Sequence, residues 1–143
     1  MKQQTVLFLC THNSARSQMA EGLLNTLFKS KYKAFSAGIA PKEVNPYAIE
    51  VMKELGIDIS DHKSKSIEEF RDMTFDYVVT VCDNAKESCP FFPGKKVIHK
   101  SFNDPAIFNG NIEDTLDVFR KVRDDIKIWI ITTFGKKSDI KRL

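Results

Sequence analysis

The chain has 143 residues, which is enough for one domain with a sizeable hydrophobic core, and we expect a single domain over residues 1–143. Lys and Arg number 22 against 19 Asp and Glu, and this excess is too small to indicate nucleic-acid binding. No apolar stretch approaches the length of a membrane span, and no signal-peptide pattern opens the chain. We therefore expect a cytoplasmic monomer that binds neither nucleic acid nor membrane.

Apolar runs alternate with helical patterns along the chain. Strands are predicted over residues 4–9, 32–38, 76–81 and 95–100, and helices over 17–30, 46–56, 66–73 and 112–134. Asn45-Pro46 is a helix-start signal, and Ser66 with Glu69 forms a capping box. Four strands with intervening helices predict an α/β fold, with a four-stranded parallel sheet flanked by helices on both faces.

Three reactive side chains each follow a predicted strand: Cys10, Cys82 and Asp104. Ligands of parallel α/β sheets bind at the carboxyl ends of the strands. The fold class therefore predicts that these three side chains gather at one edge of the sheet, although they lie far apart in the sequence.

The most informative segment begins at Cys10, where an apolar run ends and a Cys-x5-Arg loop leads into a helical pattern. In such a loop the backbone N–H groups and the helix N-terminus favour negative charge, and Arg16 adds a planar fork that matches a tetrahedral oxyanion. The same groups favour the thiolate form of Cys10, which is the nucleophile. We expect the oxyanion to be held by Thr11, His12, Asn13, Ser14, Ala15, Arg16 and Ser17.

The alternative for Cys10 is a structural cysteine, because any Cys has an Arg six residues later about one time in twenty by chance, so the spacing alone is weak evidence. The flanking strand and helix make the nucleophile the better interpretation. Within the loop, Ser17 is able to donate a hydrogen bond to the Cys10 sulfur, and Asn13 tolerates left-handed geometry. For His12 an exposed imidazole is a better prediction than a proton shuttle.

Asp104 precedes Pro105, and this pair has two interpretations. Asp-Pro is common in turns. A carboxyl group that faces the oxyanion loop could also act as a general acid and protonate a departing oxygen.

Cys82 and Cys89 complete a set of three cysteines. Both could be small apolar side chains near a strand, although the residues before Cys89 are polar. Residues seven apart on a helix are separated by about 10 Å along its axis, whereas a disulfide needs Cα atoms within about 7 Å. If residues 82–89 form a helix when reduced, a disulfide between its ends must unwind it.

The segment from Val6 to Glu21, together with Phe35–Gly38 and Asn103–Ala106, resembles the low-molecular-weight protein tyrosine phosphatase superfamily. The loop sequence Thr-His-Asn-Ser-Ala-Arg-Ser is most similar to that of the thioredoxin-coupled arsenate reductases. The resemblance implies a general-acid role for Asp104 and reduction of arsenate by a relay from Cys10 to Cys82 and then Cys89. It also implies thioredoxin as the external reductant and no bound cofactor.

Some reductases of this type hold a monovalent cation beside the loop. Asn13, Glu21 and Ser36 are compatible with that, but Lys65 stands where a further acidic ligand is expected, so we assign no metal. Two other functions stay open. One is a phosphatase acting on phosphotyrosine or a small phosphoester, and the other is a redox or anion sensor that signals through residues 82–89.

Overall fold

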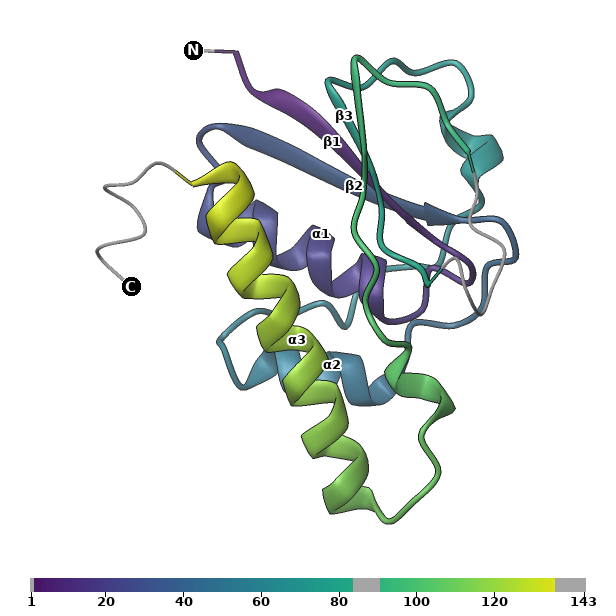
Figure 1. The fold of residues 1–143 in the computed structure, drawn as a ribbon, viewed down its shortest axis with the longest axis vertical. Coiled ribbons are helices and arrows are strands. Elements are labelled where there is room, and N and C mark those ends of the chain that lie inside the picture. The colour runs from purple at the N-terminus through teal and green to yellow at the C-terminus, as the bar shows by residue number, and fades with distance from the viewer. Residues whose placement is uncertain (1, 84–90, 136–143) are drawn as a thin grey trace.

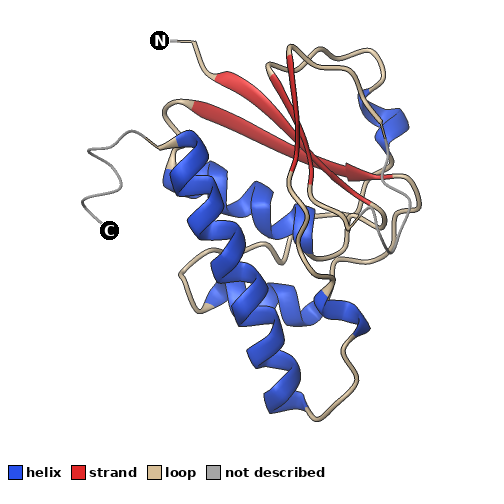
Figure 2. Cartoon of the chain, viewed as in Figure 1, coloured by secondary structure: helices blue, strands red, loops and turns tan. Residues whose placement is uncertain are grey.

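A computed structural model describes residues 2–83 and 91–135 of the chain (Figure 1). Four parallel strands form one sheet in the order β2–β1–β3–β4 (Figure 2). They are β1 (Gln4–Cys10), β2 (Tyr32–Gly38), β3 (Tyr77–Thr80) and β4 (Lys96–His99). All four predicted strands are confirmed, and their ends differ from the prediction by at most one residue.

The described residues also form three α-helices and two short 3₁₀ helices, of which α1, α2 and η1 lie between strands and η2 and α3 follow the last strand. They are α1 (Arg16–Leu27), α2 (Pro46–Lys53), η1 (Ile67–Phe70), η2 (Pro105–Ile107) and α3 (Ile112–Phe134). Within the described ranges, no helix is both long enough and apolar enough to cross a membrane.

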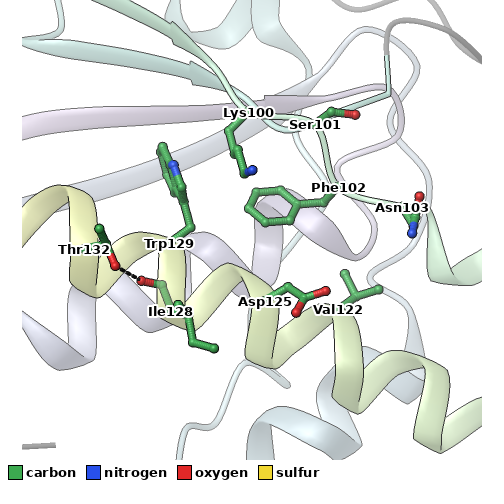
Figure 3. Close-up of a pocket in the computed structure, with 9 residues that line it drawn as sticks. All are labelled: Lys100, Ser101, Phe102, Asn103, Val122, Asp125, Ile128, Trp129 and Thr132. Atoms are coloured by element: carbon green, nitrogen blue, oxygen red, sulfur yellow. Dashed lines mark hydrogen bonds between the residues drawn. The ribbon is translucent and has the colours of Figure 1, made fainter.

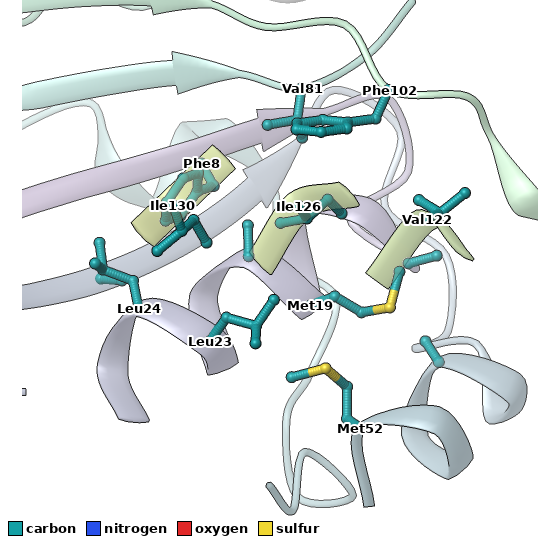
Figure 4. Close-up of a cluster of buried hydrophobic side chains, with 14 of the residues drawn as sticks. Phe8, Met19, Leu23, Leu24, Met52, Val81, Phe102, Val122, Ile126 and Ile130 are labelled. Carbon is teal, nitrogen blue, oxygen red and sulfur yellow. The ribbon is translucent and has the colours of Figure 1, made fainter. Parts of the chain in front are cut away.

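The larger core lies on the face of the sheet that all three α-helices cover (Figure 1). Val6 and Phe8 of β1 point to this face and are fully buried. The helices contribute mainly Leu and Met from α1 and α2 and β-branched residues from α3; the labelled ones are Met19, Leu23, Leu24, Met52, Val122, Ile126 and Ile130 (Figure 4). The helix predicted over residues 112–134 is therefore confirmed.

The opposite face carries a smaller, aromatic core. Leu7 and Leu9 of β1 point to this side and pack with η1 and the surrounding loops. Phe75 lies at its centre, in edge-to-face contact with Phe70 and Phe92 at centroid distances of 6.0 and 5.8 Å. Helices thus cover both faces as predicted, but within the described residues the second face has a single short 3₁₀ helix, η1.

Three helices end earlier than the pattern predicts. Helix α2 ends at Lys53, whereas the pattern runs to residue 56. Helix α1 stops at Leu27 because the Phe28 carbonyl accepts hydrogen bonds from the N–H groups of both Lys31 and Tyr32, at 3.0 Å each, which forms a turn into β2. The capping box predicted at Ser66 is present, but the helix it starts is a 3₁₀ turn that ends at Phe70. Local hydrogen bonds determine where these helices end, and the apolar periodicity of the sequence does not predict such hydrogen bonds.

The carboxyl ends of the central strands meet at one edge of the sheet. Cys10 lies opposite Gly38 of β2, and Leu9 lies opposite Thr80 of β3. The Val81 N–H extends the second ladder by donating to the Leu9 carbonyl at 2.9 Å. This geometry places the residues that follow β1, β2 and β3 beside one another.

Candidate active site

Residues 10–16 form the loop between β1 and α1, and the segment after β2 braces its outer side. Three loop carbonyls accept backbone hydrogen bonds from that segment, those of Thr11, His12 and Ser14, from Ala40, Lys42 and Asn45 at 2.9, 3.0 and 2.9 Å. The backbone N–H groups of residues 12–15 donate to no acceptor in the described parts of the chain. Free N–H groups in a loop that opens a helix form an anion-binding concavity.

Gly38 makes this bracing possible. A Cβ atom at Gly38 would lie 2.6 Å from the Thr11 carbonyl oxygen and 2.9 Å from that of Cys10. Real side chains do not approach a backbone oxygen so closely. A residue without a side chain is therefore required where β2 passes the loop.

Cys10 lies at the base of the loop as a free, buried thiol. Its Sγ is 2.8 Å from Ser17 Oγ, and Asn13 Nδ2 donates to the same Oγ at 2.8 Å. Since Ser17 Oγ accepts from Asn13, its own proton is available to Cys10. The Ser17 hydroxyl is therefore placed to donate a hydrogen bond to the Cys10 sulfur.

Asn13 fixes the shape of the loop. Its φ of 49° is the one positive value among the non-glycine residues that the structure describes. Its Oδ1 accepts hydrogen bonds from the Lys65 N–H and from Gln18 Nε2, both at 2.9 Å. The amide group is therefore held at both ends, with its NH₂ directed at Ser17.

Arg16 and Asp104 face each other across the cavity. Arg16 is buried, its Nη1 donates to the Phe102 carbonyl at 3.3 Å, and its Nη2 lies 3.6 Å from Asp104 Oδ2. The other carboxylate oxygen, Oδ1, accepts the Ala106 N–H at 3.0 Å and caps η2. The two interpretations of Asp104 are therefore compatible, because one oxygen forms the turn and the other faces the oxyanion loop.

A cavity of about 200 Å³ opens above Cys10. Its lining contains most of the predicted site and some residues that the sequence analysis missed; the full set is Cys10, His12, Ser14, Ala15, Arg16, Lys42, Asn45, Asp104 and Ala106. Of the predicted binding residues, Ser14 also donates through Oγ to the Glu43 carbonyl at 2.8 Å. His12 is partly exposed, and its Nδ1 lies 2.9 Å from the Ala40 carbonyl, which suits a structural imidazole.

Lys42 belongs to no motif, and Asn45 was recognised only as the start of a helix, so the sequence analysis identified neither as a site residue. Their place in the topology could have identified them: in a parallel sheet, the chain after β2 leaves the sheet at the same edge as the chain after β1, so its first residues lie near the oxyanion loop. Gly38, at the end of the predicted second strand, marks that exit.

Cys82 follows β3 and is fully buried at the same edge of the sheet. It takes part in a disulfide, and its partner is not Cys10, which is a free thiol. Cys89 and the predicted change across residues 83–89 concern a segment, 84–90, that lies outside the described residues.

Glu21, Ser36 and Asn13 do not fit a monovalent cation. Glu21 Oε1 accepts from Ser36 Oγ at 2.7 Å and lies 3.8 Å from the Lys65 ammonium, while Oε2 lies 3.3 Å from His62 Nδ1. Asn13 Oδ1 already has two N–H donors. A cation at this place would face an ammonium group, so we derive no step through one.

The segment before Asp104 is anchored on α3. The Phe102 ring meets the Trp129 ring edge to face at a centroid distance of 6.2 Å, and a second cavity of about 400 Å³ opens beside the pair (Figure 3). Because the Phe102 carbonyl also binds Arg16, this aromatic contact helps to position both Arg16 and Asp104.

The loop, the arginine, the aspartate and the parallel sheet together define one class of protein. Residues 5–137 match the family of low molecular weight phosphotyrosine protein phosphatases, and the chain belongs to this family.

Within the family, the chain is similar to proteins named arsenate reductase. That of Halalkalibacterium halodurans is 44% identical over 127 residues, which cover 88% of this chain and 91% of that protein. Arsenate reductase 1 of Staphylococcus epidermidis is 44% identical over 134 residues, 92% and 96% of the two chains.

Solved structures give the same picture. An arsenate reductase in the phosphate binding state superposes with a TM-score of 0.78 at 34% identity, covering 91% of this chain and 95% of that one. A low molecular weight protein tyrosine phosphatase from T. tengcongensis gives 0.70 at 28% identity, covering 99% and 100%. A thioredoxin-dependent arsenate reductase from Corynebacterium glutamicum gives 0.62 at 28% identity, covering 99% and 64%.

Proposed function

We propose that the protein reduces arsenate to arsenite with three cysteine thiols, and that thioredoxin regenerates the thiols. The observation that carries the proposal is the Cys10 thiol at the base of an anion-binding loop, with Cys82 at the end of the adjacent strand. The names of the relatives support arsenate as the oxyanion.

In the first step the Cys10 thiolate attacks arsenic, and one arsenate oxygen leaves. The loop N–H groups and Arg16 hold the remaining oxygens and their negative charge. Asp104, 3.6 Å from Arg16 and on the rim of the cavity, supplies the proton with which the departing oxygen leaves as water. The product is a Cys10–arsenic(V) thioester.

In the second step the Cys82 thiolate attacks Cys10 Sγ. A sulfur–sulfur bond forms, the sulfur–arsenic bond breaks, and its electron pair stays on arsenic, which leaves as arsenite. Two thiols have lost two electrons and arsenic has gained them. Cys89 then attacks Cys82 and releases the Cys10 thiolate, and an external dithiol reduces the Cys82–Cys89 disulfide by exchange.

Hydrolysis of phosphoesters is the second candidate, because it needs only Cys10, Arg16 and Asp104, and because the family and the T. tengcongensis structure favour it. The cavity gives it less support. Ala106 lines the cavity after the Asp-Pro pair, and Ile107 points into solvent at 70% exposure. None of the lining residues described is Phe, Tyr or Trp, so no such ring is available to stack on a tyrosine side chain. A sensor remains the third candidate, and clean disulfide formation without turnover would favour it.

The test is arsenate-dependent NADPH oxidation with thioredoxin and thioredoxin reductase, beside hydrolysis of an aryl phosphate by the same preparation. We expect arsenate turnover that disappears in Cys10→Ser, since a serine hydroxyl is far less ionised than a thiol at neutral pH. More than a trace of either activity in Cys10→Ser would contradict the assignment of the nucleophile. Phosphoester hydrolysis without arsenate turnover in the wild type would favour the phosphatase.

A further inference from the structure

Lys42 is a cation at the mouth of the catalytic cavity, and no motif assigns it a role. Its backbone N–H donates to the His12 carbonyl at 3.0 Å, so the oxyanion loop itself fixes its position. It is the one lysine among the lining residues that the structure describes.

The other basic side chains of the cavity already have partners. Arg16 faces Asp104 at 3.6 Å, and His12 Nδ1 lies 2.9 Å from the Ala40 carbonyl. In contrast, no carboxylate of the described residues forms an ion pair with the Lys42 ammonium. Lys42 is therefore the cationic side chain that an incoming anion can engage without breaking an existing pair.

The direction of attack decides which oxygen meets Lys42. A nucleophile at the base of the cavity displaces the oxygen opposite to it, so the departing oxygen points toward the open side of the cavity, whose lining includes Asp104 and the exposed Lys42. In a free oxyanion this oxygen carries a share of the negative charge. In a phosphoester it carries an organic group, which an ammonium does not attract.

We propose that Lys42 is a specificity residue that selects inorganic oxyanions over organic phosphoesters by pairing with the oxygen at the mouth. The size of the cavity favours the same choice, because about 200 Å³ lies below the ~300 Å³ at which pockets for drug-sized ligands begin. The proposal deepens the proposed function and rests on the same site.

Equilibrium binding tests this selection without turnover. Inorganic phosphate and phenyl phosphate are titrated by calorimetry into the full chain carrying Cys10→Ser, with and without Lys42→Gln. A partly exposed charge-assisted contact is worth about five- to tenfold in affinity. We expect Lys42→Gln to weaken phosphate binding by about that factor and to change phenyl phosphate binding by less than about twofold.

Two further variants serve as controls. Lys53→Gln makes the same charge change at an exposed residue of α2, away from the cavity lining, and leaves both affinities unchanged. Lys42→Arg keeps the charge and retains most of the phosphate affinity. An equal loss for both ligands in Lys42→Gln, or no loss for phosphate, overturns the proposal. Neither result depends on arsenate reduction, so the proposed function is tested separately, by thioredoxin-coupled turnover in the wild type.

Discussion

At the scale of single residues, Asn13 combines an unusual backbone conformation with the hydrogen bonds that orient Ser17. Left-handed geometry costs most L-residues roughly 1–2 kcal/mol, and Asn tolerates it better than residues with branched or larger apolar side chains. The φ of 49° and the three side-chain hydrogen bonds of Asn13, at 2.8–2.9 Å, therefore act together to hold the loop in its open shape.

Substitution of Asn13 separates these two contributions. Asn13→Gly removes the hydrogen bonds but permits the backbone conformation, whereas Asn13→Ala removes the bonds and adds strain. We expect both variants to slow alkylation of Cys10 at neutral pH, because Ser17 loses its orientation. In urea unfolding, we expect the free energy of unfolding of Asn13→Ala to be about 1 kcal/mol lower than that of Asn13→Gly. Equal stability of the two variants would show that the backbone at residue 13 is not strained.

The sequence predicts the residues of the site unevenly. Cys10 and Asp104 could be predicted because each has a recognisable chemistry and follows a strand, and Arg16 because it lies six residues after Cys10 at the start of a helix. Lys42 could not, since an exposed lysine in a loop has no local signature. Its place depends on the backbone bonds between residues 40–45 and the oxyanion loop, which form only in the folded chain.

At the scale of elements, one carboxylate links α2 to α3. Glu54 caps the end of α2 and accepts hydrogen bonds from Arg120 Nη2 and Arg123 Nη1, each at 2.8 Å. Arg123 is buried and also donates to the Val51 carbonyl at 2.8 Å, so it satisfies the end of α2 as well. The hydrogen bond from Arg120, and then that from Arg123, hold the pKa of Glu54 below its ordinary value despite partial burial.

This lowered pKa predicts a pH-dependent contribution to stability. Because the folded pKa lies below the unfolded one, the contribution is complete above the unfolded pKa and is lost as the pH falls through the folded pKa. We expect Glu54→Gln to lower the free energy of unfolding by about 1 kcal/mol at neutral pH, and by much less at about pH 3.

Urea unfolding at both pH values measures the effect of Glu54→Gln. Glu50→Gln, on the same helix but without an ion pair in the described parts of the chain, is the control and stays close to the wild type at both. A loss in Glu54→Gln that is equally large in acid would show that packing, not charge, carries the effect.

Elements were more predictable than their ends. The pattern over residues 112–134 gave α3 its observed bounds, since a long amphipathic helix has a strong period and Asn111 caps it. The pattern over 17–30 overran α1, because Phe28 is apolar and buried whether or not it is helical.

At the scale of the whole molecule, the parallel sheet brings Cys10 and the buried Cys82 to adjacent strand ends. The sequence predicted this gathering because each cysteine follows a predicted strand of a parallel sheet. It did not predict that all three α-helices share one face, because β1 is apolar on both faces and its residues give no sign of which side is covered by helices.

The central claim is that arsenate reduction passes from Cys10 to Cys82 before it reaches Cys89. The most direct measurement is peptide mapping, under non-reducing conditions, of reduced Cys89→Ser after one equivalent of arsenate, with Cys82→Ser treated alongside. The account predicts a Cys10–Cys82 disulfide and one equivalent of arsenite from Cys89→Ser, and no such disulfide from Cys82→Ser. Absence of that disulfide, or full thioredoxin-dependent turnover by Cys89→Ser, would contradict the relay.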